Sequence, residues 1–280
     1  MIPFDLFYYR PDTVDEALQA YGDLVRQHRH PAFYAGGTEI LTRSRVQDVH
    51  IDAVIDLKAI PSLRIHRDDG QTLQLGAALR LTEVADLNLW PLLTATADRI
   101  ADYTARRQIT LGGNLLSVLP YREAVLPFLL MDSAKVELAT QHGLQTRRFA
   151  DVWDTALNLN PGEFLVSLRV DSQEARNLTF RSHKMTRLDW IDYPLVTIAL
   201  AQPASGRVRA AFSGWNSYPF HSSTVDQILS DVSRSPQARA ADAVSNMPMP
   251  AVSDIHGSAE YRQFVTQYTL SDMLTELEES

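Results

Sequence analysis

The chain has 280 residues, 45% of them hydrophobic, and a net charge of −8, which suits two domains with buried cores. An acidic chain is repelled by nucleic-acid phosphates and anionic membranes, so we expect neither as a partner. The absence of cysteine excludes disulfides, thiolate metal sites and an iron–sulfur cluster held by this chain.

The N-terminal half predicts short strands that alternate with helices. Thr13 and Glu16 have the spacing of a capping box, and the apolar residues after them repeat on one helical face. Asp68-Asp69-Gly70 separates two alternating runs and indicates a hairpin. We expect a helix over 14–25, strands over 32–35 and 53–57, hairpin strands over 63–66 and 72–75, and helices over 82–89 and 92–103.

The second half changes character near residue 172, where we place a domain boundary. Before it we expect a β-like run over 109–111, a hairpin of 135–139 with 144–149, and a strand over 164–170. After it we expect three antiparallel strands over 178–183, 195–201 and 208–212, then helices over 224–232, 237–244 and 259–277.

The chain is predicted to be a soluble, cytoplasmic protein. Residues 1–5 lack the basic and apolar segments of a leader, and the apolar run 195–201 is too short to span a bilayer. We predict no metal site. His28 and His30 are the only close histidine pair, and no carboxylate stands near them in the sequence, so a solvated loop is favoured there.

Two glycine pairs are the strongest chemical signal. Gly36-Gly37 and Gly112-Gly113 each follow a β-like run and are flanked by small polar residues. Glycine permits positive φ and close backbone approach, and successive amides in such a turn can bind an anion. Two facing loops of this kind suit a dinucleotide pyrophosphate, although one pair alone more often marks only a tight turn.

These segments resemble the two FAD loops of the flavin subunit of molybdenum hydroxylases, the family of xanthine dehydrogenase and carbon monoxide dehydrogenase. Residues 35–41 are similar to the first loop and residues 110–114 to the second. The resemblance covers essentially the whole chain. Further matching segments are 7–11, 16–18, 54–57, 75–77 and 261–262.

The resemblance implies an α+β fold of the PCMH/vanillyl-alcohol-oxidase type. Residues 1–172 would form an FAD-binding domain of two α/β subdomains, about 1–57 and 58–172. Residues 173–280 would form a small C-terminal domain with a three-stranded antiparallel sheet and a helical bundle.

The resemblance also implies which residues bind FAD. Glu123 stands where the family usually has an aspartate, and Lys184 would lie at the flavin edge or, as an alternative, be a surface lysine near Arg181 and Arg187. The implied cofactor-binding residues are Tyr34, Ala35, Gly36, Gly37, Thr38, Glu39, Ile40, Ile100, Thr110, Leu111, Gly112, Gly113, Asn114, Glu123, Leu165 and Lys184. No residue is expected to act as an acid or base, because the flavin carries the redox chemistry.

The sequence departs from the family pattern before and after the second loop. Arg107 and Ile109 replace the usual asparagine and alanine, and residues 120–123 differ from the usual small-residue run. The segment Pro120-Tyr121-Arg122-Glu123 is similar to that of purine-type hydroxylase subunits, which suggests a purine or another N-heterocycle as substrate.

The implied function is electron transfer within a molybdopterin-dependent hydroxylase. A large molybdopterin-binding subunit and a small [2Fe–2S] subunit would be the partners, in a dimer of heterotrimers, and NAD⁺ or another acceptor would receive the electrons. Two alternatives stay open. One is a stand-alone flavoprotein oxidase, and the other is a structural assembly subunit whose FAD site has eroded.

Overall fold

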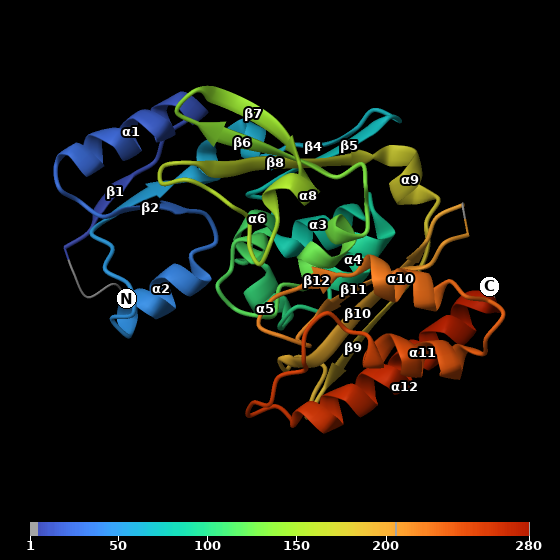
Figure 1. Ribbon diagram of the computed structural model, residues 1–280. Coiled ribbons are helices and arrows are strands. Elements are labelled where there is room, and N and C mark those ends of the chain that lie inside the picture. Colours follow the sequence, from blue (N-terminus) through green and yellow to red (C-terminus); the bar gives the residue numbers. More distant parts are fainter. Residues whose placement is uncertain (1–4, 205, 280) are drawn as a thin grey trace. The chain divides into compact units, whose positions relative to one another are not determined.

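The computed structural model describes residues 5–204 and 206–279, and it combines helices with parallel and antiparallel sheets (Figure 1). This confirms the predicted α+β class. Residues 1–4, on which the absence of a leader was partly argued, lie outside the described residues. No helix among the described residues has the length and apolar character needed to cross a membrane.

The chain divides into two compact units, each built from three separate segments of the sequence. The first unit contains the residues up to Val84, Tyr103–Ser117 and Ser133–Asp171. The second unit contains Ala85–Asp102, Val118–Asp132 and the residues from Ser172 onward. The second unit therefore includes two segments that precede residue 172.

A three-stranded parallel sheet carries the N-terminal part of the first unit. Its strand order is β1-β3-β2, and β3 pairs with β1 from Phe7↔Ala53 and with β2 from Pro31↔Ala53. The Thr13 hydroxyl caps α1, whose buried Ala17 and Leu24 face the sheet. The elements are β1 (Phe7–Tyr9), α1 (Val14–Arg26), β2 (Pro31–Tyr34), α2 (Thr38–Arg45) and β3 (Ala53–Asp56).

A five-stranded antiparallel sheet forms the rest of that unit's framework, in the order β4-β5-β8-β6-β7. Residues of both sheets pack into one core, because Ile55 of β3 and Val166 of β8 belong to the same buried cluster. The strands are β4 (His66–Asp68), β5 (Thr72–Gly76), β6 (Lys135–Thr140), β7 (Gly143–Arg148) and β8 (Phe164–Asp171).

Short helices connect these strands or belong to the second unit. Several last only one or two turns, and α3 ends where Asn88 has a φ of +44°. They are α3 (Leu81–Leu87), α4 (Pro91–Ala97), α5 (Tyr103–Arg106), α6 (Leu111–Leu115), α7 (Leu126–Leu129), α8 (Phe149–Val152) and α9 (Ser172–Arg176).

An antiparallel sheet covered by helices forms the framework of the second unit. Its order is β12-β11-β10-β9, and α12 packs along β9 and β10 (Figure 1). The buried Arg262 of α12 donates to the carbonyl of Gly214 at 2.7 Å and to Asp254 at 2.8 Å. The elements are β9 (Thr179–Thr186), β10 (Pro194–Gln202), β11 (Arg209–Ser213), β12 (Phe220–His221), α10 (Ser223–Leu229), α11 (Pro236–Ser245) and α12 (Ala259–Glu278).

Four predicted elements differ from the structure. The strand expected over 63–66 is replaced by a 3₁₀ helix at Pro61–Arg64, and the first strand of that hairpin is β4, His66–Asp68. The sheet of the second unit has four strands, since the two-residue β12 pairs with β11. The helix predicted over 92–103 ends at Ala97, and Ala101 has a φ of +48°, which a helix cannot accommodate. The β-like run 109–111 makes only an isolated bridge at Thr110, because the Thr110 hydroxyl caps α6 instead.

Candidate functional site

The first glycine segment lies where the parallel sheet ends. Strand β2 stops at Tyr34, and Gly37 is the N-cap of α2 with a φ of +70°. A Cβ at Gly37 would lie 2.2 Å from the Tyr34 ring, so a side chain there would strain the backbone and displace that ring. The cap residue provides no side-chain hydrogen bond to the first turn of α2.

The second glycine segment has a different geometry. Its glycines lie inside α6 without positive φ. The Leu111 and Gly112 amides each donate at 2.8 Å to carbonyls at Leu79 and Ala77. The amides of Gly113 and Asn114 donate to the hydroxyl and carbonyl of Thr110, at 3.2 and 2.9 Å. Backbone amides 111–114 are thus occupied within the chain, and this segment can offer a ligand its surface shape and side chains.

The two glycine segments pack against each other within the first unit. A Cβ at Gly36 would lie 2.2 Å from the carbonyl oxygen of Gln108 and 3.3 Å from the Thr110 amide nitrogen. The Ser117 hydroxyl, just after α6, donates to the Glu39 carboxylate in the first turn of α2. The structure therefore brings the segments together, and the missing side chain at Gly36 makes that contact possible.

A lysine that the sequence reasoning missed supports the first segment. The ammonium of Lys58 donates to the Ala35 carbonyl at 3.0 Å and to the Asp56 carboxylate at 2.8 Å. It also lies 4.3 Å from the centre of the Tyr34 ring. Lys58 places a positive charge beside Gly36-Gly37. The sequence did contain a signal for Lys58, which stands two residues after the end of β3, the strand that pairs with β2. Ligands of open sheets bind at these strand ends.

Asp56 connects this lysine to the neighbouring strand. Its carboxylate also accepts from the Tyr8 hydroxyl of β1 at 2.6 Å. Burial by itself raises the pKa of Asp56, but the hydrogen bonds from Lys58 and Tyr8 outweigh it, so the pKa lies below its usual value. The hydrogen bond to Asp56 in turn raises the pKa of the Tyr8 phenol. The ends of β1, β2 and β3 thus meet in one charged network.

The remaining predicted residues lie elsewhere. Leu165 is buried in β8 of the first unit, whereas Ile100, Glu123 and Lys184 belong to the second unit. The Lys184 ammonium lies 3.9 Å from the Glu123 carboxylate and donates to the Arg99 carbonyl at 2.8 Å. Its side chain is only 5% exposed, so the alternative of a surface lysine is wrong. Burial raises the pKa of Glu123, and the Lys184 charge opposes that rise.

The unusual segment 120–123 contributes to an aromatic cluster of the second unit. Tyr121 stacks on Tyr193 with ring centres 4.9 Å apart, and His256 lies edge-on to both rings. Burial, followed by the negative charge of Asp254, raises the pKa of Tyr121 to about 12. Tyr121 is therefore an uncharged phenol throughout the physiological range.

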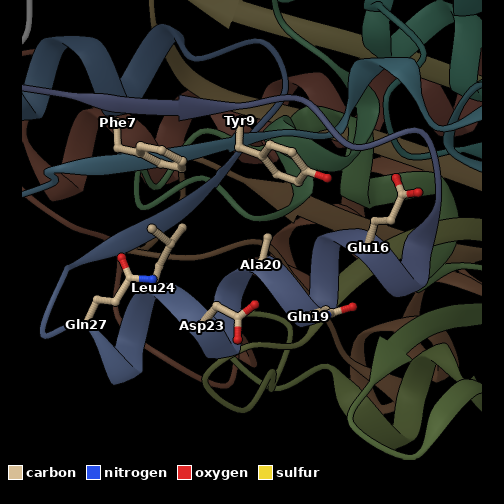
Figure 2. A pocket seen from close by; sticks show the side chains of 8 residues that line it. All are labelled: Phe7, Tyr9, Glu16, Gln19, Ala20, Asp23, Leu24 and Gln27. Atoms are coloured by element: carbon tan, nitrogen blue, oxygen red, sulfur yellow. The ribbon is translucent and has the colours of Figure 1, made fainter.

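A pocket of about 390 Å³ lies between β1 and α1 in the first unit (Figure 2). Phe7 and Tyr9 line it from β1, and α1 contributes polar and acidic side chains that include Glu16 and Asp23. The Glu16 carboxylate accepts from the Asp12 amide at 2.9 Å, and Asp23 pairs with Arg26. The residues that line this pocket include no lysine or arginine, whereas Lys58 lies beside Gly36-Gly37, so the glycine segments are the better dinucleotide site.

The fold and these glycine segments define a class of protein. Residues 3–171 match the family of FAD binding domains in molybdopterin dehydrogenases, and the chain belongs to that family. It is thus an FAD-binding chain of the molybdenum hydroxylases, a group of oxidoreductases. The resemblance seen in the sequence is confirmed.

The chain is similar to three individual relatives. It is 25% identical over 284 residues to the nicotine 6-hydroxylase medium subunit of Paenarthrobacter nicotinovorans, covering 96% of both chains. It is 32% identical over 120 residues to the carbon monoxide dehydrogenase medium chain of Hydrogenophaga pseudoflava, covering 41% of this chain and 40% of that one. With the nicotinate dehydrogenase FAD-subunit of Eubacterium barkeri it shares 26% identity over 157 residues, or 54% and 51% of the two chains.

Solved structures share the fold. Carbon monoxide dehydrogenase from Hydrogenophaga pseudoflava superimposes with a TM-score of 0.85 at 22% identity, over 98% of both chains. Quinoline 2-oxidoreductase from Pseudomonas putida 86 gives 0.84 at 19% identity, over 100% of this chain and 98% of that one.

Proposed function

We propose that this chain is the FAD-carrying electron-transfer subunit of a molybdopterin-dependent hydroxylase. It would receive electrons from [2Fe–2S] clusters on a small partner chain and pass them to NAD⁺ or another acceptor. The observation that carries the proposal is the packing of the two glycine segments within a region that matches an FAD-binding family.

The residues present fit a dinucleotide. In this proposal Tyr34 to Ile40 bind the pyrophosphate at the N-terminus of α2, whose N-cap residue is Gly37 and carries no side chain. Lys58 adds positive charge and holds the Ala35 carbonyl in place. Thr110 to Asn114 supply the facing wall, since their amides are already occupied.

Four further residues stay part of this proposal. Lys184 offers a buried positive charge, Glu123 an acceptor and Ile100 an apolar surface, while Leu165 of the first unit adds another apolar contact. FAD, when bound, supplies two-electron redox chemistry that no side chain of the chain can provide. The chain's own task is to hold the cofactor and set the charge around it.

The substrate and partners follow from the relatives. Two of them are named for nicotine and nicotinate, both N-heterocycles, which supports a purine or another N-heterocycle as the substrate of the assembled enzyme. The names medium chain and medium subunit support an assembly with a large molybdopterin-binding chain and a small [2Fe–2S] chain. A dimer of heterotrimers and a cytoplasmic location remain part of the proposal.

The test is the visible absorption spectrum of the purified chain, with chromatography of any cofactor released on denaturation. We expect about one FAD per chain, bleached by dithionite. A folded, monodisperse chain that stays colourless after incubation with FAD would contradict the proposal and favour a structural assembly subunit. Flavin in a chain that oxidises a substrate alone, without co-purifying partners, would favour a stand-alone oxidase.

A further inference from the structure

A second cluster of ligand-type side chains lies at the opposite end of the parallel sheet. His30 directly precedes Pro31 of β2, and Asp52 directly precedes Ala53 of β3. Because Pro31 and Ala53 are register partners, the sheet holds the two residues side by side. His50 stands two residues before Asp52 in the same loop.

The fold supplies the carboxylate that the sequence did not place near His30. The His30 amide donates to Asp52 Oδ1 at 2.7 Å, which fixes the orientation of the carboxylate. The second oxygen, Oδ2, lies 3.6 Å from His30 Nδ1. The His30 and His50 rings meet edge to face with centres 5.0 Å apart.

These three side chains have the spacing of a metal site. One ligand atom from each of His30, His50 and Asp52 lies within 4.8 Å of the other two. Donors about 2.1 Å from a tetrahedral zinc ion are about 3.4 Å apart, so the separations here, all within 4.8 Å, need to close by at most about 1.4 Å. Two imidazole nitrogens and a carboxylate are a ligand set typical of zinc and related ions.

Both histidines of the cluster are exposed, and the neighbouring cation Arg29 is held on other groups. The Arg29 guanidinium donates to the backbone carbonyl of Asp52 at 3.3 Å and lies 5.5 Å from the centre of the Phe7 ring. Arg29 therefore engages the peptide group and an aromatic face, while Asp52 Oδ2 faces the His30 ring.

We propose that His30, His50 and Asp52 bind a divalent transition-metal ion, with zinc as the best match and water at the fourth position. The ion would join the loops that begin β2 and β3. This end of β2 is about 13 Å from the glycine segment, at about 3.3 Å for each of four residues. The ion would thus stabilise the sheet that carries the glycine segment without contacting FAD.

The test is a zinc titration of the full, tag-free chain after treatment with EDTA and buffer exchange. Isothermal calorimetry should show about one Zn²⁺ per chain, and melting temperature should rise with free zinc by mass action. His30→Ala and His50→Ala should each weaken binding at least tenfold, since loss of even an outer-shell partner costs about 10–100-fold. The flavin spectrum should not change, which separates this proposal from the FAD proposal.

His28→Asn is the matched control. His28 lies in the same loop with a φ of +60°, which asparagine tolerates, and it is not one of the three cluster residues. Its zinc affinity should equal that of the wild type. Equal affinity in the His30→Ala/His50→Ala double variant, with a native circular dichroism spectrum, would overturn the proposal, as would an equal loss in His28→Asn.

Discussion

Gly36 has no space for a side chain because the Gln108 carbonyl occupies the position of its Cβ. Gly36→Ala should therefore push the two glycine segments apart. We expect a loss of about 1–3 kcal/mol in the free energy of unfolding, together with FAD affinity at least tenfold weaker, since about 1.4 kcal/mol corresponds to tenfold. Gly22→Ala is the control, since a Cβ there lies 3.5 Å from the flexible Arg26 side chain. Similar FAD affinity in both variants would contradict this role of Gly36.

Lys58 is the residue whose charge we expect to matter most to the first segment. Lys58→Met keeps much of the side chain but removes the ammonium that bridges Ala35 and Asp56. FAD affinity, measured by flavin fluorescence, should fall about 10-fold, the equivalent of one charged hydrogen bond at about 1.5 kcal/mol. Lys135→Met, at an exposed position of β6, should bind FAD like the wild type. A reduced affinity in both variants would indicate a general charge effect.

At the scale of elements, Asp56 joins the ends of β1 and β3 through Tyr8. Because its pKa is lower in the folded chain, Asp56 contributes stability that is present above about pH 4, the unfolded pKa. That contribution is lost as the pH falls through the pKa that Asp56 has in the folded chain, which is lower than the unfolded pKa. Asp56→Asn should thus cost about 1.5–3 kcal/mol at neutral pH, the value of hydrogen bonds to a charged group.

Urea unfolding at pH 7 and at a series of acid pH values measures this dependence. The difference between wild type and Asp56→Asn should shrink as the solution is acidified below about pH 4. Asp151→Asn, at an exposed position of α8, should show no such difference. A gap between wild type and Asp56→Asn that stays constant across this range would show that the carboxylate charge contributes nothing.

Elements with a strong local signal could be predicted, and those made by tertiary contacts could not. The helix after Thr13 and the hairpin around Gly70 follow from capping and turn chemistry within a few residues. Strand β12 has two residues and forms only because β11 lies beside it. The run ending at Leu111 has β-like residues, but the Thr110 hydroxyl stabilises a helix start that outweighs their preference.

The candidate site shows the same division. Gly36-Gly37 and Gly112-Gly113 could be singled out from the sequence because their composition is unusual. That Gly36 lies against Gln108, and that amides 111–114 are occupied within the chain, depends on long-range packing and could not be predicted. The roles assigned to Glu123 and Lys184 stay predictions, as does the domain boundary at residue 172.

At the scale of the whole molecule, the second unit takes its α4 and α7 segments from the first half of the chain. A fragment of residues 1–171 would retain α4 and α7 but lack the strands and helices that follow Ser172. Trp90 and Phe128 are buried in the full chain and pack edge to face. In the fragment these two side chains would lose the later strands and helices of the second unit. We expect this fragment to aggregate or bind a hydrophobic dye, whereas the full chain stays monodisperse by size-exclusion chromatography. A fragment as well behaved as the full chain would contradict this interleaving.

The interleaved order of the chain also has a consequence for its synthesis. At about 5–20 residues per second, a ribosome needs roughly 7–30 s to add the 150 or so residues between α7 and the end of α12. During that interval the apolar side chains of α4 and α7 have been made but their strands have not. A nascent chain of this protein therefore exposes an apolar surface at a predictable stage of translation. Chaperone binding should concentrate on α4 and α7 during that stage.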